Sequence, residues 1–382
     1  MKKKNVLVLT YEYPPIGGGG GVVIKNICER LSKDFNFTVI TTWFYGLEFE
    51  EKSSNIKIYR VKSLRRKEYQ SNPLEMLSWS KQAYLKSQDL LQSQNFEFVI
   101  SNFVVPGGLV AFKLKKRYNL PYVAISHGHD IPWVKPYSNY PYYILMYYKI
   151  KSIIENSEHT IVLSEELKNN ALKLVKDENK IVQINNACDG VLFYDQKKDR
   201  GDKLKLLFVG RLVSQKGVRR LLKIAQMLDC KTDFRLRIVG DGPKRSRMES
   251  FVRKNNLSNK IVFLGNIPQV DLVNLYNESH FLLAPSLSEG MSLSAIESIF
   301  CSTPVLTTKV SGMMEVIDEK ASLGKLFENN KKCINNIIEY LNNLDLKKDI
   351  GPINETSLKS FQLKFDWNIV SKKYKDLFDG IK

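Results

Sequence analysis

The chain has 382 residues, of which 43% are hydrophobic and 26% are charged. Single hydrophobic cores stop growing at roughly 250–300 residues, so this length predicts two domains. The 58 Lys and Arg outnumber the 40 Asp and Glu and give a formal net charge of +18, which favours acidic partners such as phosphorylated small molecules or anionic lipid head groups. No zinc-finger or RNA-recognition pattern accompanies the charge, so we expect no nucleic-acid partner.

The cysteines and the apolar segments predict a protein of the cytoplasm. Five cysteines are scattered along the chain, without the paired spacing of zinc or redox motifs. The apolar part of "MKKKNVLVLT" is too short for a secretion signal. No apolar run reaches the roughly 18 residues that a membrane span needs. We therefore expect reduced thiols and no integral membrane segment.

Short apolar runs separated by helical patterns make up the first half of the chain, and seven of them predict strands. They are residues 5–10, 37–42, 56–61, 96–101, 121–126, 159–164 and 180–185. Fully apolar runs with helices between them are typical of a parallel sheet that is covered on both faces.

A polar stretch at residues 194–203, "YDQKKDRGDK", predicts a linker, and six further strands follow it. They are residues 205–210, 234–240, 260–265, 281–286, 303–308 and 323–327. We expect two doubly wound, Rossmann-like α/β domains, at residues 1–190 and 191–365. In such sheets ligands bind beyond the carboxyl ends of the strands, so the loops there should carry the function.

Five consecutive glycines, Gly17–Gly21, separate the first strand from a helix. A dinucleotide fingerprint is disfavoured, because "YEYPPI" intervenes after the strand and the second strand ends in threonines instead of an acidic residue. The loop is then either a disordered tip or a set of backbone N–H groups that bind an anion at a helix N-terminus.

The segment "FVGRLVSQKGVRRLL" places Arg211 and Lys216 before the first helix of the second domain. Both cations can converge over the helix N-terminus, where the helix dipole already favours an anion. A guanidinium and an ammonium together suit a diphosphate. The alternative is a pair of ordinary surface cations.

The segment "APSLSEGMSLSAIESIF" carries two glutamates. Glu289 precedes a predicted helix, and Glu297 shares an apolar stripe with Leu293 and Phe300. A carboxylate on an apolar stripe must be paired or must bind a ligand. Eight helical residues span roughly 12 Å, which is too far for the two carboxylates to share a proton or a metal ion. We expect them to hold two ends of an elongated ligand.

The segment "AISHGHDIPW" ends a strand with His127, His129 and Asp130. A zinc site here lacks a further ligand at suggestive spacing. The absence of any Asp-x-Asp pair also disfavours a catalytic divalent metal. His127 is then either a functional residue at the edge of the sheet or a structural histidine.

Taken together, these residues resemble the retaining, nucleotide-sugar-dependent glycosyltransferases of family 4, which have the two-domain GT-B fold. Seven motifs carry the resemblance in chain order: "YPPIGGGGG", "SHGHD", "INNACD", "FVGRLVSQKG", "VGDGP", "VFLGNIP" and "PSLSEGMSLSAIESIFCSTPVLTT". The resemblance implies two Rossmann-like domains facing across a cleft, with the acceptor bound by the first and the donor by the second. It also implies a terminal helix, residues 366–382, that packs back on the first domain through Trp367, Val370, Tyr374 and Leu377.

The resemblance also implies roles for the site residues. Arg211 and Lys216 would neutralise the donor diphosphate, and Glu297 would accept hydrogen bonds from the ribose. Glu289 would lie near the donor sugar, which His127 would face. The backbone amides that would contact the donor belong to Gly18, Gly19, Gly290, Met291, Ser292 and Leu293.

Two departures from the family pattern affect the expected site. The chain has Ala187 in "INNACD" where the family has a glycine, and the turn must avoid positive φ there. After Glu289 the family has Gly-Phe-Gly-x-Pro, whereas residues 290–294 read "GMSLS". The lost glycine and proline reshape the expected sugar pocket and leave the donor's identity open.

The reaction that the resemblance implies is a retaining sugar transfer, without a metal ion or other cofactor, to a glycan or lipid-linked acceptor in cell-surface polysaccharide or glycolipid synthesis. Alternatives are a sugar-nucleotide epimerase and a binding protein without transfer activity. Basic and aromatic residues at 140–154 indicate either docking to an anionic membrane, on the inner face of the cell membrane, or tyrosines packed in the core beside solvated lysines.

Overall fold

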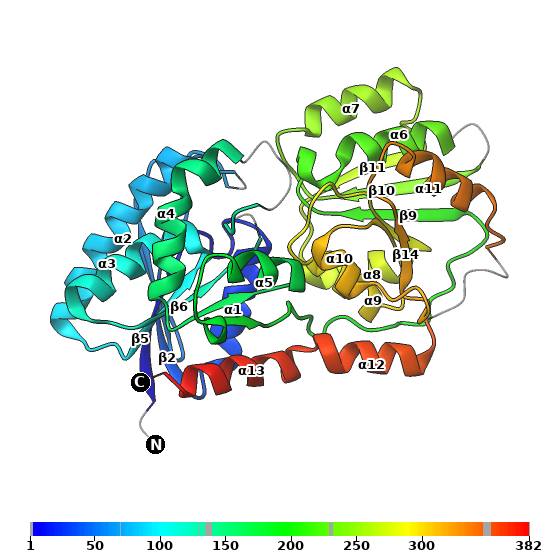
Figure 1. The fold of residues 1–382 in the computed structure, drawn as a ribbon. Coiled ribbons are helices and arrows are strands. Elements are labelled where there is room, and N and C mark those ends of the chain that lie inside the picture. The colour runs from blue at the N-terminus through cyan, green and yellow to red at the C-terminus, as the bar shows by residue number, and fades with distance from the viewer. Residues whose placement is uncertain are drawn as a thin grey trace. The chain divides into compact units, whose positions relative to one another are not determined.

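The fold comes from a computed structural model that describes residues 3–68, 70–128, 130–133, 140–228, 232–346 and 353–381. The chain divides into two compact units (Figure 1). The first comprises Met1–Asn185 and Val370–Lys382, and the second comprises Asn186–Ile369. The observed boundary thus lies shortly before the predicted one, between residues 190 and 191.

The first unit is built on a sheet of eight strands in the order β3-β4-β2-β1-β5-β6-β7-β8. All neighbouring strands are parallel except β3 and β4. The strands are β1 (Lys4–Thr10), β2 (Phe35–Thr42), β3 (Glu50–Ser53), β4 (Ile56–Val61), β5 (Phe98–Asn102), β6 (Tyr122–Ile125), β7 (His159–Val162) and β8 (Ile181–Gln183). The seven predicted strands are confirmed. β3 was not predicted, because its four residues are all exposed and show no apolar pattern.

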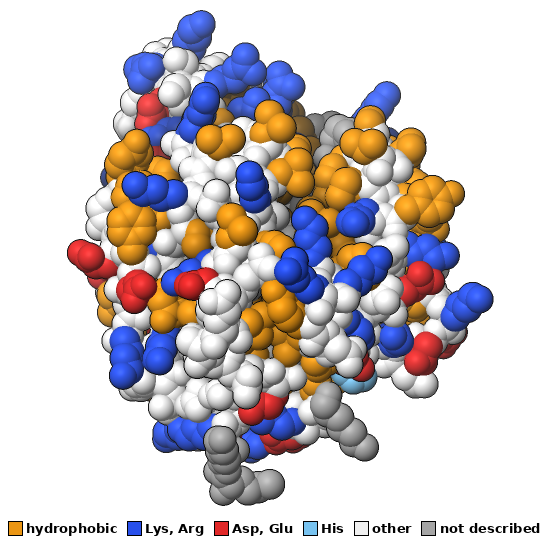
Figure 2. Space-filling model, turned by 90° about the vertical axis from the view of Figure 1, so that its left-hand side faces the viewer, with side chains coloured by type: hydrophobic (Ala, Val, Ile, Leu, Met, Phe, Trp, Pro, Cys, Tyr) orange, Lys and Arg blue, Asp and Glu red, His pale blue; other side chains and the backbone are white. Residues whose placement is uncertain are grey.

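Helices cover this sheet because its central strands are apolar throughout. The helices are α1 (Gly19–Leu31), α2 (Pro73–Ser93), α3 (Gly108–Tyr118), α4 (Tyr140–Asn156) and α5 (Glu165–Leu172). α3 packs against both α2 and α4. Figure 2 views the side of the first unit where α2 and α3 lie, and shows hydrophobic side chains among many Lys and Arg. Within the described residues, no helix is long and apolar enough to cross a bilayer.

The last helix, α13 (Trp367–Asp379), belongs to the first unit from Val370 onward. Phe378 is fully buried against Phe35 and Phe98, with ring centroids 6.0 and 5.5 Å apart. Lys4 at the start of β1 donates to the carbonyls of Phe378, Asp379 and Ile381 at 3.3, 3.0 and 2.8 Å. The expected buried stripe holds for three residues, but Phe378 replaces the half-buried Leu377 as its last member.

The second unit has a fully parallel sheet in the order β11-β10-β9-β12-β13-β14. In chain order this is 3-2-1-4-5-6, the doubly wound order of dinucleotide-binding folds. The strands are β9 (Leu204–Val209), β10 (Phe234–Val239), β11 (Ile261–Gly265), β12 (Phe281–Ala284), β13 (Val305–Thr308) and β14 (Gly324–Phe327). The helices are α6 (Val218–Leu228), α7 (Arg245–Lys254), α8 (Gln269–Asn277), α9 (Leu293–Phe300), α10 (Ser311–Val316), α11 (Cys333–Asn342) and α12 (Glu355–Phe365). All six predicted strands are confirmed.

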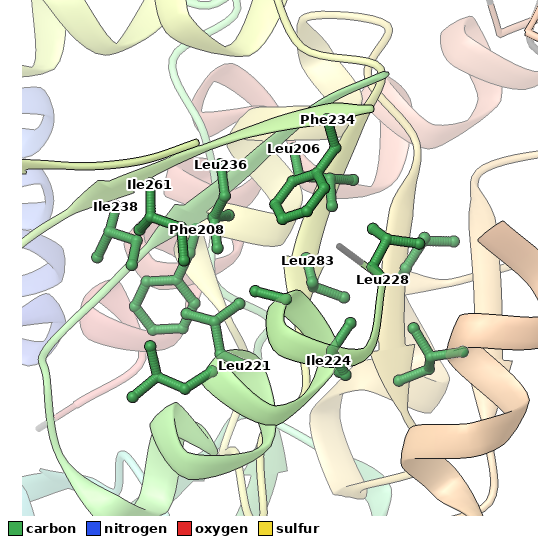
Figure 3. Packing of buried hydrophobic residues seen from close by; sticks show 14 of the residues in the cluster. Leu206, Phe208, Leu221, Ile224, Leu228, Phe234, Leu236, Ile238, Ile261 and Leu283 are labelled. Atoms are coloured by element: carbon green, nitrogen blue, oxygen red, sulfur yellow. The ribbon is translucent and has the colours of Figure 1, made fainter. Parts of the chain in front are cut away.

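The core of the second unit lies between α6 and the sheet. Leu221, Ile224 and Leu228 recur on one face of α6 and are fully buried. Figure 3 shows these side chains close to strand residues such as Phe208. Because α6 begins directly after the loop that follows β9, this packing fixes the position of that loop.

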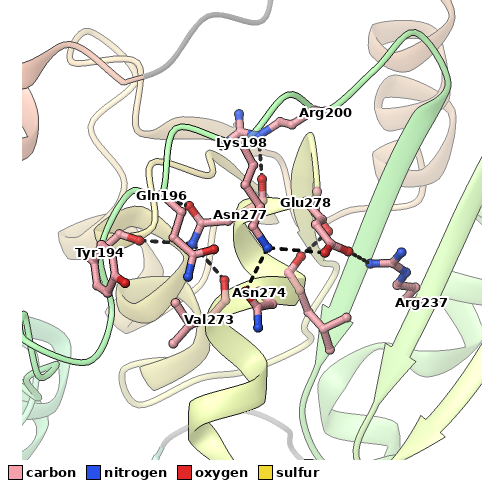
Figure 4. Close-up of polar contacts among 11 residues, drawn as sticks. Tyr194, Gln196, Lys198, Arg200, Arg237, Val273, Asn274, Asn277 and Glu278 are labelled. Carbon is pink, nitrogen blue, oxygen red and sulfur yellow. Dashed lines mark hydrogen bonds and ion pairs between the residues drawn. The ribbon is translucent and has the colours of Figure 1, made fainter.

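The polar stretch that predicted a linker lies inside the second unit and is anchored to α8. Asn277 donates to the carbonyl of Tyr194 at 3.1 Å and accepts from the backbone N–H of Gln196 at 2.7 Å. Glu278 pairs with Lys198 at 3.5 Å and with Arg237 at 2.6 Å (Figure 4). The stretch is therefore an ordered part of the surface of this unit.

We predict that Ile224→Ala lowers the free energy of unfolding of the second unit by about 2–5 kcal/mol, because it leaves a cavity in a fully packed core. Urea denaturation followed by circular dichroism measures the change. Lys223→Ala, at an exposed position of the same helix, is the matched control and should change it by less than about 0.5 kcal/mol. Equal losses in both variants would contradict the assigned core.

Candidate functional site

The candidate site of the second unit lies where the strand order reverses. β9 and β12 are neighbours in the sheet, although β10 and β11 come between them in the chain. Loops that follow such a pair leave in opposite directions and open a crevice, which is where doubly wound sheets bind their ligands. Arg211 and Lys216 lie in the loop after β9, and Glu289 lies in the loop after β12.

The two loops are held against each other by backbone contacts. Gly217 has a φ of 68°, and a Cβ there would collide with the carbonyl of Pro285. The backbone N–H of Leu287 donates to the carbonyl of Gln215 at 2.8 Å, and the Gln215 amide donates to the carbonyl of Ser288 at 3.1 Å. A glycine is thus required at 217, both for its left-handed conformation and for this close approach.

A cluster of three side chains bridges these loops. Lys216 Nζ lies 2.7 Å from Glu289 Oε1, and Ser286 Oγ donates to the same oxygen at 2.8 Å. The side chains of Lys216 and Glu289 are 18% and 8% exposed. Partial burial strengthens the attraction between the charges. The Lys216 ammonium is therefore fixed at the carboxyl edge of the sheet.

Arg211 shares the loop with Lys216 but is not part of this cluster. Its side chain is exposed, and within the described part of the chain no carboxylate pairs with its guanidinium. The structure therefore brings Lys216 and Glu289 together and leaves Arg211 at the surface of the same loop.

Glu297 lies on α9, and its side chain is buried and hydrogen-bonded. The Tyr276 hydroxyl donates to Glu297 Oε2 at 2.8 Å, and Gln269 forms a second side-chain hydrogen bond to this carboxyl. Burial raises the pKa of Glu297 to about 7, although both hydrogen bonds act to lower it. The carboxyl therefore changes its charge near neutral pH.

Residues 290–293 lead into the N-terminus of α9, where backbone N–H groups lack helical partners. Asn186 Nδ2 donates to the carbonyl of Met291 at 3.0 Å and fixes this segment. Ser292 stands where the family has a glycine and adopts a φ of −82°, which any residue tolerates. Ala187 has no positive φ either. Both departures from the family pattern therefore fit without backbone strain.

The glycine loop of the first unit follows β1, and α1 begins at Gly19. The Glu12 side chain folds beneath the loop and accepts from the backbone N–H of Gly18 at 2.9 Å. Gly17 has a φ of 103°, and a Cβ there would collide with Glu12. A carboxylate of the chain itself therefore accepts from the Gly18 N–H group, one of those that the family resemblance implies for contact with the donor.

His127, after β6, is joined to the glycine loop through Asn102 at the end of β5. His127 Nε2 lies 2.7 Å from Asn102 Oδ1, and Asn102 Nδ2 donates to the carbonyl of Gly20 at 3.2 Å. The Phe103 ring packs on the imidazole, with centroids 4.7 Å apart. A Cβ at Gly20 would come within 2.5 Å of the Phe103 ring. This explains the need for a glycine at position 20.

These contacts assign the proton of His127. The carbonyl of Gly20 can only accept, so the amide nitrogen of Asn102 must face it and the amide oxygen must face His127. The imidazole must then donate from Nε2. Burial lowers the pKa of His127 to about 4, so the ring is neutral at pH 7. Nδ1 is therefore left as a hydrogen-bond acceptor.

Asp130 has a structural role. Its carboxylate accepts from the Ser126 hydroxyl at 2.6 Å and from the backbone N–H of Val104 at 2.7 Å. It thereby ties the loop after β6 to the turn after β5. In the described part of the chain, no three His, Cys, Asp or Glu residues are grouped to hold a metal ion. The sequence analysis weighed a zinc site at His127, His129 and Asp130, but His129 lies outside the described residues.

A separate cavity of about 880 Å³ lies in the second unit, between residues 195–202 and α12. Arg200 lines it, but this guanidinium already donates to the carbonyl of Ser302 at 2.9 Å and to the Thr303 hydroxyl at 3.1 Å. The cavity lies away from the loops after β9 and β12. We therefore place the candidate site at those loops.

Several residues of the site escaped the sequence analysis. Glu12, Asn102 and Ser286 each lie within two residues of the carboxyl end of a buried strand. Polar residues at that position are a usable signal, because these strand ends converge on the binding edge. Tyr276 gives no such signal, since an apolar helix position and a hydrogen-bonding one look alike in sequence.

Two protein families together match most of the chain. Residues 17–190 match the family described as Glycosyltransferase Family 4, and residues 193–356 match Glycosyl transferases group 1. The uncharacterized glycosyltransferase MJ1178 of Methanocaldococcus jannaschii is 30% identical over 380 residues, which cover 98% of this chain and 99% of that relative. The chain belongs to the family 4 glycosyltransferases.

Other relatives of this glycosyltransferase extend the comparison. The N-acetyl-alpha-D-glucosaminyl L-malate synthase of Bacillus anthracis is 24% identical and covers 96% of this chain and 94% of that relative. The structure of a sucrose-phosphate synthase from Thermosynechococcus elongatus matches with a TM-score of 0.84 at 18% identity, over 99% of this chain and 98% of the other. Anabaena HepE in complex with UDP-glucose matches with a TM-score of 0.75 at 16% identity, over 98% and 99%. The glycosyltransferase therefore has the GT-B fold.

We predict that Asn102→Asp raises the pKa of His127 from about 4, because an adjacent carboxylate favours the imidazolium by about 1–3 pKa units. Carbon-13 NMR titration of the four histidines measures this, with His127→Gln used to assign the signal. Asn170→Asp, at a buried asparagine on α5, is the control and should leave the value unchanged. An unaltered pKa of His127 in Asn102→Asp would contradict the assigned contact.

Proposed function

We propose that the enzyme transfers a sugar from a nucleotide sugar, with retention of anomeric configuration and without a metal ion, to a glycan or lipid-linked acceptor in cell-surface polysaccharide or glycolipid synthesis. The Lys216 and Glu289 pair carries the proposal, because it fixes a cation at the ligand-binding edge of the second sheet. The HepE structure, which contains UDP-glucose, supports a nucleotide-sugar donor. The proposed place of action is the cytoplasm.

The second unit has groups suited to each part of such a donor. Lys216 and Arg211 suit the diphosphate, and the N–H groups of residues 290–293 add hydrogen-bond donors. The buried Glu297 can accept hydrogen bonds from ribose hydroxyls. Its contacts with Tyr276 and Gln269 fix the position of the carboxyl.

The contacts of Glu289 support a mechanism that relies on charge stabilisation. Glu289 Oε1 is engaged by both Lys216 and Ser286, which makes this carboxylate a weak nucleophile. Lys216 stabilises the negative charge that develops on the leaving diphosphate. Glu289 holds that cation in place, so catalysis depends on positioning rather than on a covalent sugar intermediate.

The first unit suits the sugar and the acceptor. The unprotonated Nδ1 of His127 can accept from a sugar hydroxyl. A lipid-linked acceptor has support from a relative in Homo sapiens, a component of phosphatidylinositol N-acetylglucosaminyltransferase, which is 27% identical over 59% of this chain and 46% of that relative.

We predict that Lys216→Ala weakens nucleotide-sugar binding by about 10–100-fold, because it removes a charge-assisted hydrogen bond worth about 1.5–3 kcal/mol. A thermal-shift screen of nucleotide sugars identifies the donor, and calorimetry then compares the variants. Lys223→Ala, on the exposed side of α6, is the control. Wild-type affinity in Lys216→Ala would refute the site. Release of free nucleoside diphosphate, with the α-anomer found in the product, would establish transfer with retention for an α-linked donor.

We also predict that affinity for the nucleotide sugar rises with pH as Glu297 ionises near pH 7. The diphosphate of a nucleotide sugar is esterified at both ends and does not titrate there. Tyr276→Phe removes a hydrogen bond that lowers the pKa of Glu297, so the midpoint should move to higher pH. Calorimetry from pH 5.5 to 8.5 measures both midpoints, and an identical midpoint in the variant would contradict the role of Tyr276.

The raised pKa of Glu297 also makes the free energy of unfolding depend on pH. The folded-state pKa of Glu297 is raised above the ordinary value of 4.5 to about 7, so the folded state binds more protons in this interval. The contribution of this group to the free energy of unfolding is therefore complete below about pH 4.5 and is lost as the pH rises to about 7.

A further inference from the structure

α4 has an apolar outer face in its N-terminal half. Ile144, Leu145 and Tyr148 are 68%, 83% and 81% exposed. They fall within one sector of about 100° on the helix surface, because residue i+4 lies between residues i and i+1 around an axis with 3.6 residues per turn. A surface helix of a soluble domain usually presents polar residues to water here.

The inner face of α4 already satisfies the core of the first unit. Tyr143, Ile150, Ile153 and Ile154 are fully buried. The exposed residues therefore add nothing to the packing of the domain. The helix is apolar on two sides where the fold requires one.

Cations lie beside this outer face. Lys149 is exposed one turn from Leu145, and its ammonium lies 5.4 Å from the centre of the Phe112 ring. Lys116 of α3 approaches the same ring at 4.7 Å, so the cations of the two helices converge there. The last six residues of α3 contain no acidic residue and four cations, namely Lys113, Lys115, Lys116 and Arg117. Lys115 is paired with Glu158 at 2.7 Å, so the other three are the cations of α3 that can contact an anionic partner. Figure 2 shows Lys and Arg among hydrophobic side chains on this side of the first unit.

We propose that the outer face of α4 docks on an anionic lipid membrane. Ile144, Leu145 and Tyr148 enter the boundary between head groups and acyl chains, while Lys149 and the cations of α3 contact the head groups. This is how an amphipathic helix lies in the plane of a membrane surface. The proposal goes beyond the transfer reaction, since it depends on no group of the donor site.

The charge of the patch selects this occupant over others. A second copy of the chain would bring the same cations together and be repelled. A nucleic acid would match the charge but gives no reason for exposed aliphatic side chains such as Ile144 and Leu145. An anionic bilayer satisfies both the charge and the apolar face.

The test is sedimentation of the full chain at low salt with phosphatidylcholine vesicles, with or without phosphatidylglycerol, in the absence of nucleotide sugar. We expect partition onto the anionic vesicles only, and release by salt. The double variant Leu145→Ser and Tyr148→Ser should lower the partition coefficient by more than about tenfold, because it removes most of the inserted apolar area. Lys149→Gln should lower it by about fivefold.

Leu363→Ser on α12 is the matched control, since this leucine is 68% exposed and lies in the second unit. It should leave partition unchanged, and circular dichroism should show the same thermal unfolding for all variants. Wild-type protein that stays in the supernatant, or equal loss in Leu363→Ser, would overturn the proposal. The proposal would also be overturned if the wild-type chain did not bind vesicles but formed dimers in ultracentrifugation, and the double variant were monomeric. Nucleotide-sugar binding, measured separately, tests the proposed function independently.

Discussion

The proposed donor site of this glycosyltransferase depends on the contact between two loops at the point where the strand order of the second sheet reverses. Gly217 allows the loop after β9 to meet the backbone at Pro285, and the Lys216 to Glu289 pair joins the same loops through their side chains. The loop after β9 is also anchored by the core, because α6 packs its buried leucines on the sheet directly after Gly217. The packing of the core therefore fixes the position of the Lys216 ammonium at the carboxyl edge of the sheet.

In the first unit, neutral groups also join two loops at a reversal of strand order. Its strand order also changes direction between β1 and β5, and Asn102 at the end of β5 links His127 to the backbone of Gly20. One amide thus sets the proton of an imidazole and the path of the glycine loop. The five glycines serve different needs. Gly17 and Gly20 are required by their neighbours, Glu12 and Phe103, and Gly18 is bonded to Glu12.

The sequence predicted the strands well because parallel strands covered on both faces are apolar without interruption, as in β6 and β12. It missed β3, whose exposed residues carry no such pattern. It located Lys216, Glu289 and Glu297, because charges beside glycines at strand ends or on apolar stripes are rare without a reason. It could not show that Glu289 is paired with Lys216, since that contact depends on how two loops far apart in the chain meet. Glu12 and Asn102 were missed although they are polar residues at the ends of buried strands, a position that can be read from sequence.

The central claim is that the nucleotide sugar binds at the loops after β9 and β12. Hydrogen–deuterium exchange of the full chain, with and without the nucleotide sugar that raises its melting temperature most, tests this most directly. We predict slower exchange in peptides that contain residues 210–217 and 286–297. Slower exchange confined to residues 195–202 and 355–362, which line the separate cavity, would contradict the account.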